Sequence, residues 1–320
     1  MQGGRNLLRS FRGAGICMGT ALAIWAAAPI PLSAKKAGED RQRTVQGETL
    51  PRQSVPPTED IYRAQVLLGT TLGIFWHEFG HALIGETGLP ATGPEEDVAD
   101  GFSAFVLSAA VEESGIAAEE QAFMAQVVKY SALLWYYVAE QREKSGQKQP
   151  WQDEHAPDMK RFRNSFCIIY GSNPARHEAI AQQVGLSERT RARCETEYAK
   201  RYRAWETILK TVSRDLGPNA EGVYPASAPG GRILLSFEAP GSVTGKTVVR
   251  LLNDTGIMTH MMAEMERLFV WPRDLSVVFR DCDLPNAWYD PKAGSVTLCY
   301  SLIEQLSGLI FRSEGRAWNG

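Results

Sequence analysis

Two histidines with a glutamate between them form the part of this sequence with the clearest chemical meaning. They occur in His77-Glu78-Phe79-Gly80-His81, an H-E-x-x-H motif. On a helix, residues four positions apart lie on the same face, so both imidazoles can bind one zinc ion. Glu78 can then act as the general base toward a water molecule that the metal activates. The motif therefore predicts a zinc-dependent hydrolase.

The residues around the motif favour a buried helix. Residues 66–76 are nearly all apolar and include no proline, and Ala82 and Leu83 continue the apolar run after the motif. Such a run predicts a helix within the core. A segment rich in glycine and proline follows at 88–94 and allows a second helix, which begins near residue 95, to turn back toward the first. We expect the third zinc ligand on this second helix.

Two acidic residues at the start of the second helix are candidates for that ligand. The pattern E-x-x-A-D-x-F that begins at Glu96 resembles the second zinc helix of thermolysin-like gluzincins. The resemblance implies that Glu96 binds the metal and that Asp100 hydrogen-bonds a ligand histidine, with His77 as its expected partner. Glu95 remains the alternative ligand, because it shares a helical stripe with Val98.

The first 34 residues differ in character from the rest of the chain. Arg5, Arg9 and Arg12 precede an apolar run at 14–32, as in a bacterial secretory signal. An uncleaved N-terminal anchor is the alternative, because the apolar run approaches the length that spans a membrane. We therefore expect a periplasmic or secreted protein that contacts a membrane only through this segment.

The net charge bears on possible partners, and the cysteine content bears on disulfides and zinc ligands. The 320-residue chain has a formal net charge of −3, which gives no electrostatic reason to expect nucleic acid as a partner. Four cysteines follow the signal segment, and an even number in an exported chain suggests disulfides. Two lie before and two lie after the change from helical to alternating sequence near residue 230, which favours the pairs Cys167–Cys194 and Cys282–Cys299. Cysteine ligands for zinc are not expected, because the sequence contains no C-x-x-C spacing.

Residues 35–58 are polar and charged and are predicted to form a disordered linker. The region 59–216 is predicted to be helical and to hold the zinc site. Its expected helices are 61–86, 95–113, 118–145, 157–170, 177–184 and 187–213. The region 230–320 alternates in polarity. Its expected strands are 232–237, 247–252, 275–280 and 295–300, with a helix at 259–269.

These elements predict an α+β fold, in which a mainly helical, zincin-like catalytic unit is completed by a C-terminal antiparallel or mixed sheet. A zincin normally places its sheet ahead of the active-site helix, and the edge strand binds the peptide substrate. In this chain the strands come last. We therefore expect the region 230–320 to fold back over the helix that carries His77.

Several segments together resemble a family of exported bacterial proteins described as "putative metallopeptidases". They are H-E-F-G-H-A-L from residue 77, E-E-D-x-A-D from 95, D-E-H from 153, R-F from 161, C-x-x-Y-G-S-x-P from 167, R-C-E-x-E-Y from 193, N-A-W-Y-D-P from 286 and L-C-Y from 298. In that family the N-A-x-Y-D-P and L-C-Y segments precede the H-E-x-x-H helix. The resemblance thus implies a peptidase whose segments occur here in permuted order.

His155, in the D-E-H segment, is a candidate catalytic residue. It could stabilise the oxyanion of a tetrahedral intermediate, as a histidine or tyrosine does in gluzincins. The alternative is a structural role, in which His155 caps the helix that begins near Pro157. Tyr170 and Tyr289 are other candidate donors, although tyrosines in such positions more often serve packing.

The sequence therefore predicts an exported zinc metallopeptidase that hydrolyses a peptide or protein substrate. His77, His81 and Glu96 would bind Zn²⁺, with Glu78 as the base. One alternative is a non-catalytic, zinc-containing envelope protein with a binding or structural role, although structural zinc needs no base at Glu78. A weaker alternative is an interaction module built on the helices 118–145 and 187–213.

Overall fold

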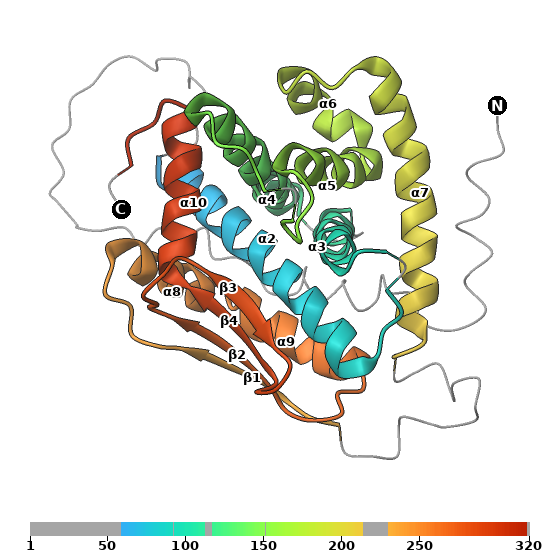
Figure 1. Ribbon diagram of the computed structural model, residues 1–320, viewed down its shortest axis with the longest axis vertical. Helices are drawn as coiled ribbons and strands as arrows, with labels where there is room; N and C mark the ends of the chain where they lie inside the picture. The colour runs from blue at the N-terminus through green and yellow to red at the C-terminus, as the bar shows by residue number, and fades with distance from the viewer. Residues whose placement is uncertain (1–58, 92, 113–116, 151, 214–229, 319–320) are drawn as a thin grey trace, which may run out of the picture.

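The computed structural model describes residues 59–91, 93–112, 117–150, 152–213 and 230–318 (Figure 1). The predicted signal segment, 1–34, and the predicted linker, 35–58, lie outside the described residues. In the described part, no helix is both long and apolar enough to cross a membrane.

The chain forms a helical region followed by a smaller region that contains a sheet. The first region consists of α2 (Glu59–Thr87), α3 (Glu95–Val111), α4 (Ala118–Ser145), α5 (Asp158–Ser172), α6 (Pro174–Gln183) and α7 (Glu188–Lys210). The second consists of β1 (Ile233–Phe237), α8 (Val243–Thr255), α9 (Ile257–Leu268), β2 (Leu275–Arg280), β3 (Ala287–Asp290), β4 (Ser295–Cys299) and α10 (Tyr300–Ser313). The predicted α+β class is confirmed.

The four strands of the described residues form one mixed sheet in the order β1-β2-β4-β3. β2 is parallel to both β1 and β4, whereas β3 is antiparallel to β4. A parallel neighbour requires a crossover connection, which α8 and α9 provide between β1 and β2. β3 lies at the edge of the sheet and pairs with no other described strand.

The strand predicted at 247–252 is wrong, because this segment lies within α8. Its β-branched and apolar residues suggested a strand. However, the buried residues Thr244, Val248 and Leu252 recur every fourth position, which is a helical period. The hydroxyl of Ser242 also accepts a hydrogen bond from the Gly245 amide and caps the helix at its N-terminus.

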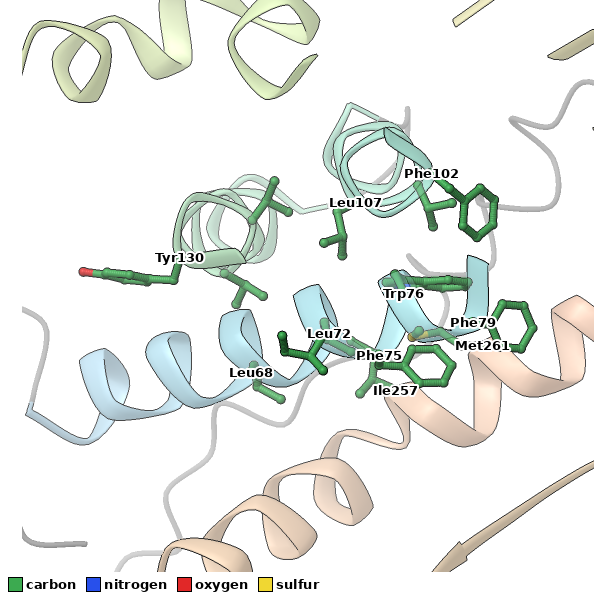
Figure 2. Close-up of a cluster of buried hydrophobic side chains, with 14 of the residues drawn as sticks. Leu68, Leu72, Phe75, Trp76, Phe79, Phe102, Leu107, Tyr130, Ile257 and Met261 are labelled. Carbon is green, nitrogen blue, oxygen red and sulfur yellow. The ribbon is translucent and has the colours of Figure 1, made fainter. Parts of the chain in front are cut away.

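α2 is the central helix of the molecule and is buried on nearly all sides, as its apolar sequence predicts. On one side, Trp76 packs edge-on against Phe102 of α3, with ring centroids 5.9 Å apart. On the other side, Phe75 and Phe79 face α9, from which Met261 points toward them (Figure 2). The H-E-x-x-H residues therefore lie on a helix that packing holds from two directions.

Glycines on α2 allow α4 to approach closely. A Cβ atom at Gly69 would lie 2.5 Å from the carbonyl oxygen of Val127, and one at Gly73 would lie 2.9 Å from the Cβ of Ser131. Both distances are too short for real carbon contacts, so any side chain here would push the helices apart. The small residues of α2 thus set the distance between the two longest helices.

The C-terminal strands lie against the end of α2 that follows the motif. The Tyr289 hydroxyl of β3 donates a hydrogen bond to Glu86 Oε1 at 2.7 Å, and Arg273 Nε donates to Glu86 Oε2 at 2.8 Å. The Tyr289 ring occupies the space beside Gly85, where a Cβ would lie 2.8 Å from it. The sheet is therefore joined to the same helix that carries His77.

Two disulfides link neighbouring parts of the chain. Cys167–Cys194 joins α5 to α7, and Cys282–Cys299 joins the loop after β2 to the end of β4. Both pairs are those favoured by the positions of the cysteines in the sequence. Two disulfides fit an oxidising, exported location.

Candidate metal centre

His77 and His81 lie one turn apart on α2 and point toward the same place. Their Nε2 atoms are 3.3 Å apart. His77 is almost fully buried, whereas His81 is partly exposed. The i, i+4 spacing thus brings two imidazole nitrogens to one site, as predicted for residues on a common helical face.

Glu96 of α3 faces both nitrogens. Its Oε2 lies 3.1 Å from His77 Nε2, and its Oε1 lies 3.5 Å from His81 Nε2. Gly80 permits this approach of α3, because a Cβ at that position would lie 3.2 Å from Ala99 Cα. Ligand atoms about 2.1 Å from a tetrahedral zinc ion lie about 3.4 Å from one another. The three side chains therefore have separations that suit one small divalent cation.

The environment of Glu96 Oε2 provides an independent test of that fit. This oxygen is buried, and no described residue donates a hydrogen bond to it in suitable geometry. The nearest groups are imidazole nitrogens of His77 and His155, at 3.1 and 2.9 Å. A buried carboxylate oxygen is costly unless a cation balances it, and at this position either protonated imidazoles or a bound metal ion can do so. The donor set, two or three imidazoles with one carboxylate, is a typical zinc set.

Glu95 occupies a different position. Its carboxylate contacts His81 Nδ1 at 2.7 Å, on the ring nitrogen that faces away from Glu96, and its side chain is about half exposed. This is the position of a group that orients a ligand histidine. The structure thus places Glu96, and not Glu95, beside both Nε2 atoms.

Asp100 contacts the Nδ1 side of the His77 ring, and Arg161 in turn holds Asp100. Asp100 Oδ1 lies 2.9 Å from His77 Nδ1, and Arg161 donates to both Asp100 oxygens at 2.7 and 2.8 Å. The guanidinium of Arg161 lies 3.5 Å from the centroid of the Trp135 ring, which supports it by a cation–π contact. The His77 ring is therefore fixed by a chain of three further side chains.

The charges in this cluster shift the acidity of its members. Burial lowers the pKa of His77, but the neighbouring carboxylates of Asp100 and Glu96 outweigh burial and raise it to about 9. Burial raises the pKa of Asp100, yet Arg161 and His77 hold it well below its usual range. For Glu96, too, burial is outweighed by the neighbouring imidazoles, and the pKa is strongly lowered. Both carboxylates are therefore ionised at neutral pH.

Glu78 lies beside the candidate ligands but has a different environment. Burial raises the pKa of its carboxyl group above the usual value, while the positive charges of His77 and His81 oppose this effect. Glu78 lines a cleft with His77 and His155. A carboxylate with a raised pKa at the wall of a cleft is suited to accept a proton from water.

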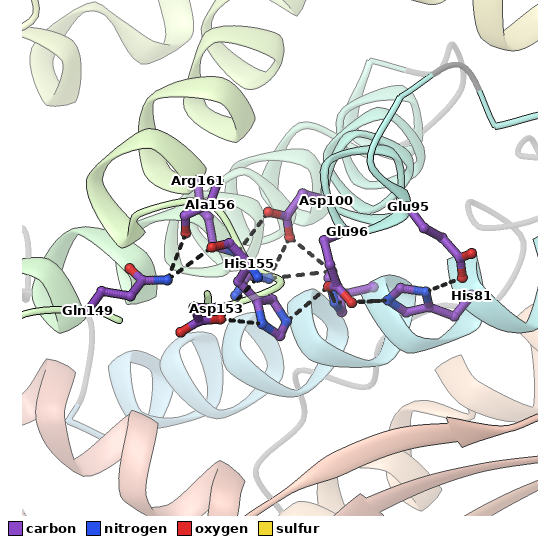
Figure 3. A network of polar contacts seen from close by, with 10 residues as sticks. His81, Glu95, Glu96, Asp100, Gln149, Asp153, His155, Ala156 and Arg161 are labelled. Carbon is purple, nitrogen blue, oxygen red and sulfur yellow. Dashed lines mark hydrogen bonds and ion pairs between the residues drawn. The ribbon is translucent and has the colours of Figure 1, made fainter. Parts of the chain in front are cut away.

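His155 comes from the loop between α4 and α5 and joins the cluster (Figure 3). Its Nε2 lies 2.9 Å from Glu96 Oε2 and its Nδ1 lies 3.3 Å from Asp153 Oδ1, which also accepts from the His155 amide at 3.0 Å. No side chain caps α5, whose N-cap is Pro157, so His155 does not have the predicted alternative role as a cap. One atom each from His77, Glu96 and His155 lies within 4.8 Å of the others.

The other two candidate donors lie elsewhere. The Tyr170 hydroxyl donates to Glu178 at 2.8 Å, and the Tyr289 hydroxyl donates to Glu86. Both hydroxyls have structural partners, as tyrosines in such positions often do. Among the donors that the sequence suggested, only His155 is brought to the centre.

The cleft beside the centre has a volume of about 570 Å³. Its walls come from α2, α4, the loop before α5, the start of β3 and α10. The lining includes Glu78 and His155 near the centre and Asn286 and Ala287 at the start of β3. The centre is thus accessible from a space bounded by both regions of the chain.

The sequence did not reveal the roles of Arg161, Trp135 and Asp153. Arg161 belongs to a segment that resembles the family, but its partner Asp100 lies 61 positions away. Trp135 stands in an aromatic run, which is typical of a helix in the core and does not indicate a contact with Arg161. Only Asp153 had a local signal, since it lies two positions before His155.

By its fold and its candidate site, the protein belongs to the class of α+β proteins in which the histidines of an H-E-x-x-H helix face a carboxylate from a second helix. A family model described as "Putative metallopeptidase" matches residues 46–209 and 237–317. The match covers more than half of the chain, so the protein belongs to this family. Neither a curated protein nor a solved structure matches the chain.

Proposed function

We propose that the protein is an exported zinc-dependent peptidase. One observation carries this proposal: His77, His81 and Glu96 present ligand atoms 3.1–3.5 Å apart beside a cleft that Glu78 lines. Structural zinc sites are closed by four protein ligands, whereas catalytic sites keep one position open. The neighbouring base and cleft support a catalytic site.

Each residue of the centre has a role in this proposal. His77, His81 and Glu96 hold the metal, and Asp100 keeps His77 in the tautomer that leaves Nε2 free. Zinc supplies the Lewis acidity that polarises a carbonyl group and acidifies water. Glu78 accepts a proton from the attacking water and delivers it to the departing amine.

His155 would act on the charge that develops during the reaction. Asp153 lies 3.3 Å from His155 Nδ1, which leaves Nε2 directed into the centre. In that position Nε2–H can donate a hydrogen bond to the oxyanion of a tetrahedral intermediate. His155 would thus stabilise the oxyanion electrostatically, and Asp153 would orient the His155 ring.

The edge strand β3 offers a place for the peptide backbone. Asn286 and Ala287, at its start, line the cleft with Glu78, and no described strand covers the outer edge. An extended peptide can add to such an edge through main-chain hydrogen bonds. This arrangement supports a peptide over a small-molecule substrate.

Metal content and hydrolysis, measured on the same samples, test the proposal. Wild-type protein purified without chelator should contain one zinc ion per chain and cleave peptides in a mixed library. Glu78→Gln should keep the zinc, while the rate of hydrolysis falls by about two to four orders of magnitude. Metal-free wild-type protein would contradict the proposal.

The matched pair Glu96→Gln and Glu95→Gln tests the ligand assignment. Glu96→Gln removes an anionic ligand and should strongly weaken zinc binding. Glu95→Gln should leave the zinc content nearly unchanged, because an amide can still accept a hydrogen bond from His81 Nδ1. The opposite pattern would transfer the ligand role to Glu95.

The second candidate function is a non-catalytic zinc site in an envelope protein. One observation favours it: His155 Nε2 lies 2.9 Å from Glu96 Oε2 and could complete a four-ligand site. His155→Ala separates the two functions. A catalytic site keeps its zinc and loses activity in this variant, whereas a closed structural site loses zinc affinity.

A further inference from the structure

α10 has apolar residues on two faces. Ile303, Ile310 and Phe311 are fully buried in the core. A second set, Leu302, Leu306 and Leu309, is only partly buried and lines the cleft. An amphipathic helix on a protein surface needs one apolar face, which the core already satisfies. These three leucines contact the edge of the core, and their exposed parts can contact a ligand in the cleft.

Other helices also contribute apolar residues to this cleft, beside polar ones such as Gln141 of α4. Trp135 and Val138 of α4 and Ile74 of α2 line the same cleft. Ile74 lies one turn before Glu78 on α2, so the apolar part of the cleft leads directly to the candidate base. These apolar residues suit a large apolar side chain next to the bond that is cleaved.

Among the described residues that line the cleft, one cation has no carboxylate partner. Arg142 pairs with Asp158 at 2.7 Å, and Arg161 pairs with Asp100. Arg312, in the last turn of α10, also lines the cleft and forms no ion pair within the described part of the chain. The end of the cleft at the C-terminus of α10 thus carries an unbalanced positive charge.

We propose, on the basis of the proposed peptidase function, that the cleft selects peptides with an apolar residue near the scissile bond and a carboxylate further along. The apolar side chain packs against Leu302, Leu306 and Leu309, and the carboxylate pairs with Arg312. Leu306 and Arg312 are six residues apart on the helix, or about 9 Å. An extended peptide spans this distance with about three residues. The carboxylate belongs to an acidic side chain or to the peptide C-terminus.

Peptide binding to the zinc-loaded Glu78→Gln variant tests this selectivity without turnover. The probes are synthetic peptides taken from the cleavage sites found with the wild-type protein. One peptide has Glu at the distal position and an amidated C-terminus. A second has Gln there and an amidated end, and a third is shortened to place a free C-terminus at that position. A fourth replaces the apolar residue by Asn.

The expected result is a preference for the charged peptides that depends on Arg312. The Glu peptide or the free-acid peptide should bind about two to five times more tightly than the Gln amide, as for a partly exposed ion pair. Comparison of these two peptides identifies the source of the carboxylate. Added salt should reduce the preference. Replacement of the apolar residue by Asn should weaken binding by about tenfold or more.

Variants of the cleft provide the decisive comparison. In the Glu78→Gln background, a second substitution Arg312→Gln should abolish the preference for charged over neutral peptides. Arg189→Gln, a control at an exposed position of α7, should preserve this preference. Leu306→Asn should reduce the discrimination between the apolar and Asn peptides. If Leu306→Asn does not fold, Arg312→Gln still tests the charge.

Two outcomes would overturn the inference, and they can be told apart. Peptides that are cleaved with zinc dependence, but bind with equal affinity whether charged or neutral, would exclude this selectivity and leave the peptidase function intact. A zinc-loaded protein that neither binds nor cleaves any peptide of the library would exclude both.

Discussion

Glu96 lies in the middle of the candidate centre. Its carboxylate lies near His77, His81 and His155, which belong to two different parts of the chain. In the metal-free protein the pKa of His77 is about 9, so this imidazole carries a proton at neutral pH. In the proposed zinc site the metal would compete with that proton, so we expect zinc binding to release protons to the solvent.

Arg161 should act as a positioning residue for the metal site. Arg161→Met removes both hydrogen bonds to Asp100, so Asp100 no longer holds His77 in place. We expect zinc affinity to fall by about 10- to 100-fold, as for other groups that support a metal ligand. Competition with a coloured chelator measures this directly.

Arg163→Met is the matched control for this prediction, because Arg163 lies on the same helix and is exposed. Arg161→Lys keeps the charge but cannot form the two parallel bonds, and should give an intermediate affinity. Wild-type affinity in a folded Arg161→Met protein would show that Asp100 orients His77 without help.

At the scale of elements, the contact between α2 and α4 should be sensitive to small changes in size. Gly69→Ala places a methyl group 2.5 Å from the Val127 carbonyl oxygen, which is backbone and cannot move aside easily. We expect a loss of about 1–3 kcal/mol in the free energy of unfolding, measured with urea. At Gly93 a Cβ would meet nothing within 4 Å, so Gly93→Ala should be nearly neutral. Equal effects of both substitutions would exclude steric contact as the cause.

The helices of the first region could be predicted from the sequence because their signals are local. The predicted helix 118–145 has the bounds of α4, and the predicted helix 61–86 lies within α2. The second region was harder to predict. The β-branched residues of 247–252 imitated a strand, and α10 was missed because it follows β4 without any intervening loop.

The same distinction applies to the candidate centre. His77, Glu78 and His81 form a local motif, and the pattern from Glu96 to Asp100 covers little more than one helical turn. The contacts of Arg161 with Asp100 and Trp135 join three helices. No local pattern encodes such contacts, because they depend on how α3, α4 and α5 pack.

At the scale of the whole molecule, one buried histidine should make stability depend on pH. Burial lowers the pKa of His177 in α6 from 6.5 to about 4, and the charge of Arg176 adds to this effect. The unfolded chain therefore binds more protons than the folded protein between these values. Above pH 6.5 the low pKa of His177 has no effect on the free energy of unfolding. As the pH falls toward 4, we expect this free energy to decrease by roughly 3 kcal/mol.

Urea unfolding of the wild type and of His177→Gln, at several pH values between 7 and 4, isolates this contribution. Other groups titrate in both proteins, so the difference between the two profiles reports on position 177. The wild type should lose more stability than the variant over this range. Parallel profiles would contradict the prediction.

Because the sheet follows the helical region in the sequence, it is synthesised last. The candidate ligands and their supports, from His77 to Arg161, all precede β3 and α10 by more than a hundred residues. Synthesis starts at the N-terminus, so a growing chain contains the metal ligands long before the far wall of the cleft. During that interval Phe75 and Phe79 also lack their cover from α9. If the proposed peptidase function holds, the chain therefore contains its metal ligands before its substrate cleft is complete, and we expect hydrolysis only after the C-terminal elements have been made.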